Sequence, residues 1–246
     1  MRVGLFIPCF VDQLKPAVAI ATLELLERFG CDVFYPENQT CCGQPLANAG
    51  LESESLPVMK QFVSSFEECD YIVSPSGSCV LHVREHYDTL DQTDSVQRIR
   101  SQTMELCEFL TDILHIERLD ASFPHRVGVL ASCHGLRGLR LGAASELVEQ
   151  RPDKVRNLLD MVSGLEVVET SRSDECCGFG GTFALTEDAV SGAMGRDRLN
   201  DFLESGPAYI TGTDMSCLMH LEGIIRRNEL PLRVLHVAEI LNGGAA

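Results

Sequence analysis

The sequence predicts an α/β fold of two pseudo-symmetric repeats, each with a largely parallel sheet and cysteines at the carboxyl ends of its strands. Three observations lead there: short β-rich apolar runs alternate with amphipathic stretches, their order repeats, and each repeat holds one Cys-Cys-Gly triplet. Strands that alternate with helices are typical of parallel sheets, because a parallel connection needs a long crossover. We expect residues 1–123 and residues 124–246 to form two cysteine-rich repeats, packed as one compact body.

The first half contains three predicted strands and three predicted helices. Residues 2–8 form an apolar, β-rich run that ends at Cys9 and favours a buried strand. Apolar residues that include Leu25 and Phe29 recur at helical spacing, and Gly30 follows them as a helix stop. We expect strands at residues 2–8, 32–36 and 71–74, and helices at residues 15–29, 53–68 and 97–114.

The second half repeats this plan after Pro124 and His125. We expect strands at residues 126–132, 165–170, 208–212 and 233–237, and helices at residues 136–150, 154–162 and 188–204. Four landmarks recur: an upstream cysteine, the Cys-Cys-Gly triplet, a downstream cysteine, and a phrase that contains Glu108 or Glu239. Their offsets are 124, 135, 138 and 131 residues, and such a steady offset indicates an internal duplication.

Eight of the eleven cysteines follow the order of the duplication. The two sets are Cys9, Cys41, Cys42 and Cys79, and Cys133, Cys176, Cys177 and Cys217. The carboxyl ends of parallel strands share one edge of the sheet, and neighbouring strands lie ~4.8 Å apart, so thiols distant in sequence can meet there. We expect each set to be a cradle of four thiolates. The three cysteines without a repeat partner are expected in the core: Cys31, Cys69 and Cys107.

Each pair of adjacent cysteines must lie on a turn to face one site, because successive side chains on a strand point in opposite directions. Gly43 and Gly178 can supply the positive φ of such a turn. Gly180 and Gly181 extend the second glycine run, whose N–H groups could face anionic sulfides. Four thiolates serve iron–sulfur clusters and structural zinc alike, so the ligand count leaves both open.

Composition narrows the function classes. The net charge of −16 argues against nucleic-acid binding, which needs clustered Lys and Arg. The sequence has no run of eighteen apolar residues, which a membrane span would need. The N-terminus predicts a strand rather than a signal peptide, so we expect a cytoplasmic protein. The number of cysteines, eleven, is odd, and disulfides are rare in the reducing cytosol. Metal or redox chemistry is therefore favoured over disulfides. Electron transfer, thiol–disulfide exchange and zinc scaffolding remain open.

The cysteine spacing carries a family resemblance. Cys-x31-Cys-Cys-Gly-x35-Cys and Cys-x42-Cys-Cys-Gly-x38-Cys resemble the twice-repeated cysteine-rich CCG domain of the B component of heterodisulfide reductase and of iron–sulfur subunits of glycolate and glycerol-3-phosphate dehydrogenases. The chain is more similar to the lactate utilisation protein A family, and this likeness spans nearly the whole sequence. It rests on five segments: residues 75–79, 132–134, 176–183, 214–220 and 236–239.

The resemblance implies an iron–sulfur electron-transfer subunit of a multi-protein complex that oxidises L-lactate to pyruvate. It implies up to two [4Fe–4S] clusters on the eight cysteines, with zinc as the alternative metal, and other iron–sulfur and accessory subunits as partners. Glycolate or glycerol-3-phosphate oxidation is the alternative within this class. No catalytic residue is assigned, and the absence of an arginine-rich carboxylate motif favours substrate binding on a partner subunit.

This chain departs from the heterodisulfide reductase pattern at two positions. Where that pattern has a further cysteine in each half, this sequence has His82 and His220. Heterodisulfide reduction is therefore not expected, whereas electron transfer is. We expect the two histidines to act as hydrogen-bonding neighbours of the clusters or as packing residues, and the alternative is that they are fifth ligands. His134, which follows Cys133, is expected to steer a cluster or proton, or to cap a helix.

Overall fold

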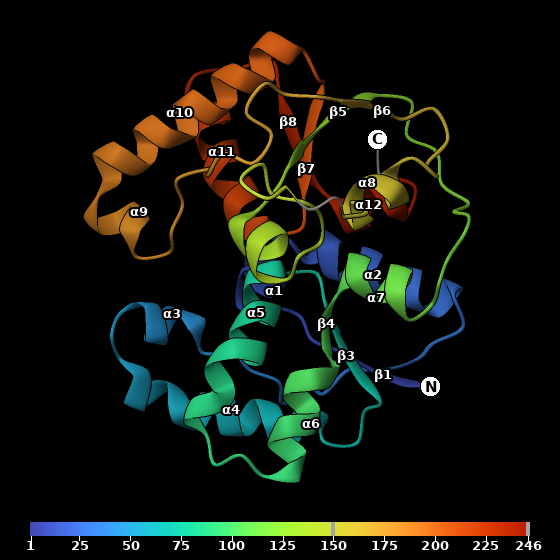
Figure 1. Cartoon of the computed structure of the whole chain (residues 1–246), viewed down its shortest axis with the longest axis vertical. Helices are drawn as coiled ribbons and strands as arrows, with labels where there is room; N and C mark the ends of the chain where they lie inside the picture. The colour runs from blue at the N-terminus through green and yellow to red at the C-terminus, as the bar shows by residue number, and fades with distance from the viewer. Residues whose placement is uncertain (149–150, 245–246) are drawn as a thin grey trace.

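The computed structural model describes residues 1–148 and 151–244 and confirms the α/β class (Figure 1). Two four-stranded sheets are parallel throughout, with the orders β2-β1-β3-β4 and β6-β5-β7-β8. The identical order is the structural expression of the duplication. The strands are β1 Arg2–Leu5, β2 Asp32–Phe34, β3 Tyr71–Ser74, β4 Thr103–Glu105, β5 Arg126–Leu130, β6 Glu166–Val168, β7 Tyr209–Gly212 and β8 Arg233–His236.

In the first half the helices predicted at residues 15–29 and 53–68 are present, and the structure adds helices at residues 9–14, 44–48 and 77–86, which lie at or beside the cysteines. Helix α2 begins with Pro16, a residue whose fixed φ suits the first helical position, and ends before Gly30, whose φ is +78°. The helices are α1 Cys9–Leu14, α2 Pro16–Arg28, α3 Gln44–Asn48, α4 Glu52–Phe66, α5 Gly77–His86, α6 Asp94–Gln102 and α7 Leu106–Asp112, with a 3₁₀ turn at Tyr87–Thr89.

The second half has two long helices after its triplet, of 18 and 13 residues. Helix α10 ends at Gly206, which takes the left-handed conformation with a φ of +70°. The elements are a π-helical turn at His134–Gly138, α8 Lys154–Leu159, α9 Phe183–Thr186, α10 Asp188–Ser205, α11 Met215–Arg227 and α12 Val237–Leu241.

The single helix predicted at residues 97–114 is wrong. The structure has α6, then β4, then α7. Strand β4 pairs in parallel with β3, where Ser74 lies opposite Glu105. The Glu105 side chain then accepts the backbone N–H groups of Cys107 and Glu108 at the start of α7. Capping by this carboxylate starts a new helix, so the apolar pattern belongs to three elements.

The helix predicted at residues 136–150 is also wrong over its described part. The chain makes the π-helical turn at His134–Gly138 and then turns and bends, while residues 149–150 lie outside the described part. Arg140 has a φ of +57°, which a right-handed helix does not accommodate. Asp174 accepts the backbone N–H of Ser145 and an Arg137 N–H, and these bonds fix the irregular path.

One apolar core joins the two halves. Figure 1 shows α2, α7, α8 and α12 grouped where the halves meet, and α2 contacts α12 while α7 contacts α8. Leu25 and Phe109 from the first half share a buried cluster with Leu158 and Ile240 from the second. Burying such side chains stabilises the fold by about 1.5–3 kcal/mol each. The shared core holds the two sheets in a fixed relation.

The outer face of the first sheet has a separate core, which contains Phe6, Phe62, Phe66 and Tyr87 under α4, α5 and α6. Over the described ranges, no helix is long and apolar enough to cross a membrane.

Candidate metal centre

All eight repeat cysteines border one cavity of about 750 Å³ between the two halves. Cys9 opens α1 beyond the end of β1, and Cys79 lies in the first turn of α5 beyond β3. Cys133 precedes the π-helical turn beyond β5, and Cys217 lies in the first turn of α11 beyond β7. In each sheet these are the two central strands, and their pairing brings together cysteines about 70 to 84 residues apart in sequence.

The first quartet is a chain of interacting thiols. The Cys9 and Cys41 Sγ atoms are 3.7 Å apart. The thiols of Cys42 and Cys9 both donate hydrogen bonds to Cys41, and they hold the pKa of the Cys41 thiol well below its usual value. The Cys42 hydrogen bond has the larger effect. The interactions of Cys42 with Cys41 and Cys79, together with burial, raise the pKa of the Cys42 thiol. Pairwise interactions therefore link the four thiols in the order Cys9, Cys41, Cys42 and Cys79.

The second quartet repeats this arrangement. The thiols of Cys133 and Cys177 both donate hydrogen bonds to Cys176 and lower the pKa of the Cys176 thiol, and the Cys133 hydrogen bond has the larger effect. Interactions with Cys176 and then Cys217, and burial, raise the pKa of the Cys177 thiol. In each half the first cysteine of the triplet therefore ionises more readily than the second, and thiolate is the form that binds metal.

Backbone N–H groups support these thiolates at both triplets. The N–H of Gly43 lies 3.5 Å from Cys41 Sγ, and the N–H of Gly178 lies 3.4 Å from Cys176 Sγ. The two glycines have φ values of +94° and +90°, as predicted for the turns. Hydrogen bonds to sulfur stabilise thiolates and tune the potential of a bound iron–sulfur cluster.

The two predicted histidines lie against the triplet turns. Nε2 of His82 faces Gly43 and has no hydrogen-bond partner among the described residues, whereas Nε2 of His220 lies 3.3 Å from the Ser191 carbonyl oxygen. Burial lowers the pKa of His82 to about 4 and also lowers the pKa of His220, so both rings are neutral at pH 7. Ligation by either ring stays a prediction.

A tyrosine that belongs to no sequence motif supports the first triplet. Tyr87 Oη donates to the Cys42 carbonyl oxygen at 2.9 Å. Its fully buried ring meets Phe62 edge-on, with centroids 5.6 Å apart, and Phe62 meets Phe6 in the same way at 4.8 Å. The first turn therefore rests on an aromatic cluster.

Polar groups of α10 support the second triplet. Ser191 Oγ donates to the Gly178 carbonyl oxygen at 2.7 Å. Arg198 forms a fully buried ion pair with Asp201, which accepts the backbone N–H of Ser171 at 3.0 Å. These bonds fix the segment that leads to Cys176. None of these residues carries a motif, and only their contacts across the fold reveal the role.

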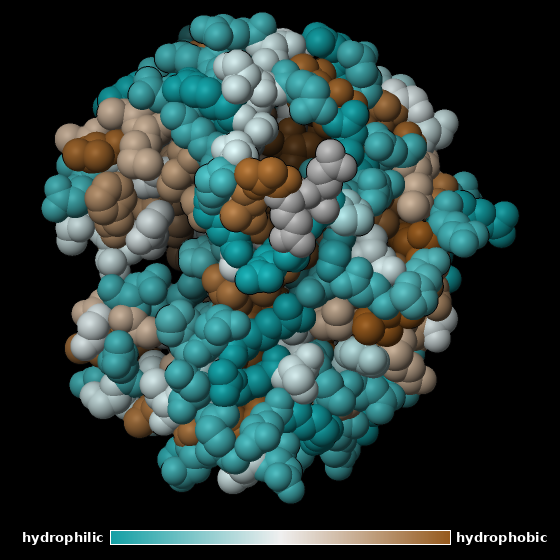
Figure 2. Space-filling view, in the orientation of Figure 1, coloured by the Kyte–Doolittle hydropathy of each residue, from teal (hydrophilic) through white to brown (hydrophobic). Residues whose placement is uncertain are grey.

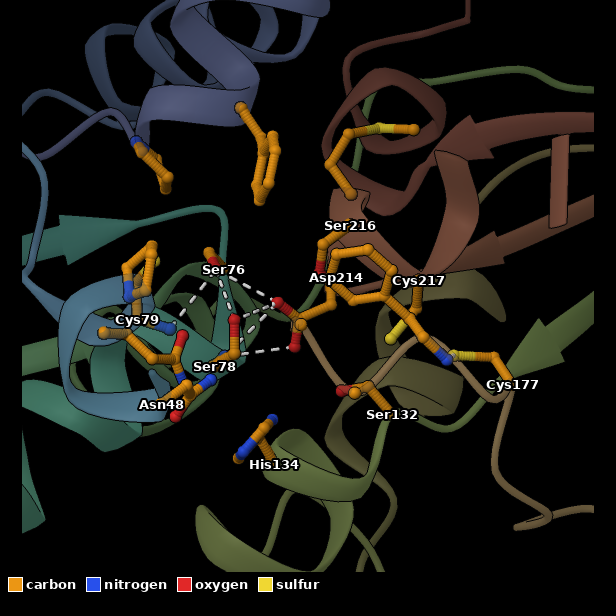
Figure 3. A pocket seen from close by; sticks show the side chains of 18 of the residues that line it. Asn48, Ser76, Ser78, Cys79, Ser132, His134, Cys177, Asp214, Ser216 and Cys217 are labelled. Carbon is orange, nitrogen blue, oxygen red and sulfur yellow. Dashed lines mark hydrogen bonds between the residues drawn. The ribbon is translucent and has the colours of Figure 1, made fainter. Parts of the chain in front are cut away.

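Asp214 forms the polar wall of the cavity between the quartets (Figure 3). The side chain is 2 % exposed and accepts three hydrogen bonds from the first half: from Ser76 Oγ at 3.0 Å, Ser78 Oγ at 2.7 Å and Ser78 N–H at 3.0 Å. Burial raises the pKa of its carboxyl group. Asp214 lies within one of the segments that carry the family resemblance, but the sequence did not predict it as a functional residue.

The mouth of the cavity lies between α3 and α9, where Figure 2 shows the surface hollowed. Phe10 and Phe179 line it, and their rings meet edge-on with centroids 6.2 Å apart. Leu185 of α9 also borders the mouth and is 84 % exposed. Among the described residues that line the cavity, none is lysine or arginine. The site is therefore apolar and sulfur-rich, with little positive charge.

The types of donor atom limit which metal groups the cavity can hold. In the described ranges, no three Cys, His, Asp or Glu side chains are grouped as they would be around one metal ion. A zinc ion would need four sulfurs within about 2.3 Å of one point. Here four soft donors of each half border a cavity instead. Soft sulfur donors of this kind bind zinc or an iron–sulfur cluster, so the donor type leaves both open.

The three remaining cysteines do not line this cavity within the part of the chain that the structure describes. Cys69 and Cys107 are buried in the two apolar cores, and Cys31 packs against the shared core. This placement confirms the prediction that Cys69 and Cys107 are core residues, whereas Cys31 is half-buried at the edge of the core.

Comparisons with known proteins agree with the duplication. A family described as the CCG cysteine-rich domain matches residues 3–84 and 127–222. The chain is 41 % identical to lactate utilization protein A of Exiguobacterium sp. over 250 residues, which cover 99 % of this chain and 98 % of that protein. It is 40 % identical to the Macrococcus caseolyticus protein of the same name, with coverages of 98 % and 96 %.

A third relative, lactate utilization protein A of Geobacillus thermodenitrificans, is 38 % identical and is covered over 99 % of its length by 98 % of this chain. Among solved structures, glutamate racemase RacE1 of Bacillus anthracis is 10 % identical with a TM-score of 0.36, over 98 % of this chain and 78 % of that one. That likeness is too low to carry an argument.

Proposed function

The chain belongs to the CCG cysteine-rich domain family and to the family of lactate utilization protein A, and from this premise we propose that it is an iron–sulfur electron-transfer subunit of a multi-protein, cytoplasmic complex that oxidises L-lactate to pyruvate. One observation carries the proposal: both thiol quartets border the same cavity. The oxidation of a hydroxy acid releases two electrons, and a bound iron–sulfur cluster would carry them one at a time.

The residues of this chain have separable roles in the proposal. One cluster, of the [4Fe–4S] type, would be held by Cys9, Cys41, Cys42 and Cys79, and the other by Cys133, Cys176, Cys177 and Cys217. Backbone N–H groups at Gly43 and Gly178 stabilise the ligand sulfurs. Phe10 and Phe179 limit the access of water at the mouth. Exclusion of water protects a reduced centre from side reactions.

The cavity chemistry favours substrate binding on a partner subunit. Lactate carries a carboxylate, which proteins usually bind with arginine or lysine. The described lining offers neither, and Asp214 adds a buried carboxyl group. The partners in this proposal are therefore other subunits of the complex, which bind lactate and pass electrons to or from this chain.

Growth on defined carbon sources tests the proposal. A strain that lacks this chain should fail to grow on L-lactate, and the wild-type chain should restore growth. Cys177→Ser should not restore it, whereas Cys69→Ser should, because Cys69 lies outside the cavity. Parallel cultures on glycolate and glycerol-3-phosphate separate the alternatives within the class. Full restoration by Cys177→Ser would contradict the proposal.

A second candidate is a thiol–disulfide redox protein. The distance of 3.7 Å between Cys9 Sγ and Cys41 Sγ favours it, because two thiols in contact can be oxidised to a disulfide. A colourless, metal-free preparation with full activity would select this candidate. A preparation with about one zinc per quartet and no iron would instead select a zinc-stabilised scaffold.

A further inference from the structure

The two repeats meet at equivalent positions that hold different residues. Ser76 precedes the helix that carries Cys79, and Asp214 precedes the helix that carries Cys217. The two residues form an isolated antiparallel bridge, and the N–H of Gly77 donates to the Thr213 carbonyl oxygen at 3.2 Å. The pseudo-two-fold relation between the halves therefore passes through this contact.

The two residues use their side chains differently. Ser76 Oγ caps its own helix by accepting the N–H of Cys79 at 3.4 Å. The Asp214 side chain makes no such cap on α11. It turns instead to the first half and accepts both hydroxyl groups and one N–H from Ser76 and Ser78. Figure 3 shows this carboxylate pointing at the Ser76–Ser78 segment, away from Cys217.

Few positive charges lie near the buried carboxylate of Asp214 in the described part of the chain. His134 faces Asp214 from the segment after β5, and the buried carboxyl of Glu105 faces it from the start of α7. The neutral ring of His236 lies at the start of α12, beside the backbone of Thr213 and Pro75. Over the described lining of the cavity there is no lysine or arginine to neutralise the carboxylate.

We propose that Asp214 is a positioning residue shared by both quartets, which fixes the starts of α5 and α11 and lowers the midpoint potential of the cluster in each half. The inference rests on the proposed function. Its distinctive part concerns the first half, to which Asp214 contributes no ligand. A fixed negative charge disfavours the addition of an electron to a nearby cluster, and the burial of Asp214 limits its screening by solvent.

Single-cluster proteins provide the test. The double variant Cys177→Ser, Cys217→Ser keeps only the first quartet. In this background we compare Asp214→Asn, Asp214→Ser and Asp197→Asn by EPR-monitored redox titration under anaerobic conditions. Asp214→Ser installs the residue that the first repeat has at the equivalent position. Asp197→Asn removes the same charge from an exposed site on α10 and is the matched control.

Both Asp214 variants should raise the midpoint potential of the first-half cluster. A change of about tenfold in the reduction equilibrium, which is about 59 mV for one electron, is expected at this burial. Asp197→Asn should leave the potential unchanged. The reciprocal background, Cys42→Ser with Cys79→Ser, should show an upward shift for the second-half cluster as well.

Three results would overturn the inference. The potential could stay constant in both Asp214 variants, it could shift no more than in Asp197→Asn, or both Asp214 variants could lose the first-half iron. Loss of iron would make Asp214 a structural brace alone. In each of these cases the proposed function stands, because the wild-type chain still holds its clusters. A wild-type chain without iron and sulfide would overturn the proposed function together with this inference.

Discussion

The two halves hold the same cysteine quartet on different supports. In the first half, the carbonyl of Cys42 is held by Tyr87, which stands in a cluster of phenylalanines. In the second half, the carbonyl of Gly178 is held by Ser191, and the approach to the triplet is held by the Arg198–Asp201 ion pair. The duplicated strand order brings the ligands together, and the support behind each triplet has diverged.

This difference teaches which features the site requires. Both halves keep a left-handed glycine after the two cysteines, a backbone N–H on the first thiolate and a hydroxyl on the turn's carbonyl. An aromatic cluster stands behind those features in the first half, and a buried ion pair holds the approach to them in the second. The supports differ in why their loss is costly: removing an aromatic side chain leaves a cavity, whereas breaking the ion pair leaves a buried charge.

The largest expected effect comes from removing a ligand. Cys42→Ser and Cys177→Ser should each remove about half of the iron, because each quartet holds its own four-thiolate cluster. Iron and sulfide determination after anaerobic purification measures this loss. Cys69→Ser is the control, since Cys69 is a buried core residue away from the cavity. Equal losses from Cys177→Ser and Cys69→Ser would undermine the ligand assignment.

Breaking the supports should sharpen the contrast between the halves. Phe62→Ala should destabilise the first half by about 3–5 kcal/mol through a cavity in the aromatic core. Arg198→Ala should cost a similar amount, about 3–5 kcal/mol, because Asp201 is left buried without its partner. In the Cys177→Ser, Cys217→Ser background, Phe62→Ala should lower first-quartet iron and Arg198→Ala should spare it. An identical loss in both would contradict independent supports.

Glu105 and His236 occupy equivalent caps with opposite pH dependence. Burial raises the pKa of Glu105 to about 8 from 4.5, so the folded state binds the extra proton and stability falls as pH rises between these values. Burial lowers the pKa of His236 to about 4 from 6.5, so the unfolded state binds the extra proton and stability falls as pH drops across that range.

Glu105→Gln should therefore flatten the alkaline side of the stability profile, and His236→Asn should flatten the acid side. Each group changes the free energy of unfolding by up to about 1.4 kcal/mol per pH unit. Anaerobic thermal unfolding between pH 4 and 8.5 measures the profile. Should Glu105→Gln keep the wild-type alkaline slope, the carboxyl of Glu105 is ionised in the folded protein.

The smallest expected effect comes from the two hydroxyls on the triplet carbonyls. Tyr87→Phe and Ser191→Ala each remove one hydrogen bond and should destabilise the protein by about 1 kcal/mol. Iron content should remain near the wild-type value, because both quartets keep their ligands. Thermal unfolding midpoints and iron determination check both expectations. A complete loss of iron from either variant would show that the carbonyl contact, rather than the ligand set, controls assembly.

The sequence predicted seven of the eight strands found in the described ranges, because apolar β-rich runs and the duplication agree at each of them. Strand β4 escaped, since its three residues lie inside an apolar pattern that also suits a helix. The echo of Glu108 in Glu239 held the missing signal: a strand was predicted before Glu239, and the repeat implies one before Glu108. The boundary between residues 123 and 124 stays a prediction.

The cysteines of the site could be predicted because their residue type and spacing carry the signal. Asp214, Tyr87 and Arg198 could not, because their roles come from contacts with Ser78, Cys42 and Asp201 that only the fold creates. Tyr87 and Cys42 are 45 residues apart, and Asp214 and Ser78 are 136 apart. The one usable clue was that the duplication pairs Asp214 with a serine.

The most direct measurement is the iron and acid-labile sulfide content of the anaerobically purified wild-type chain, with EPR of its reduced form. Two [4Fe–4S] clusters predict about eight iron and about eight sulfide per chain, with each half of that content lost separately through Cys42→Ser and Cys177→Ser. Zinc at about one per quartet with no iron or sulfide, or no bound metal at all, would contradict the account.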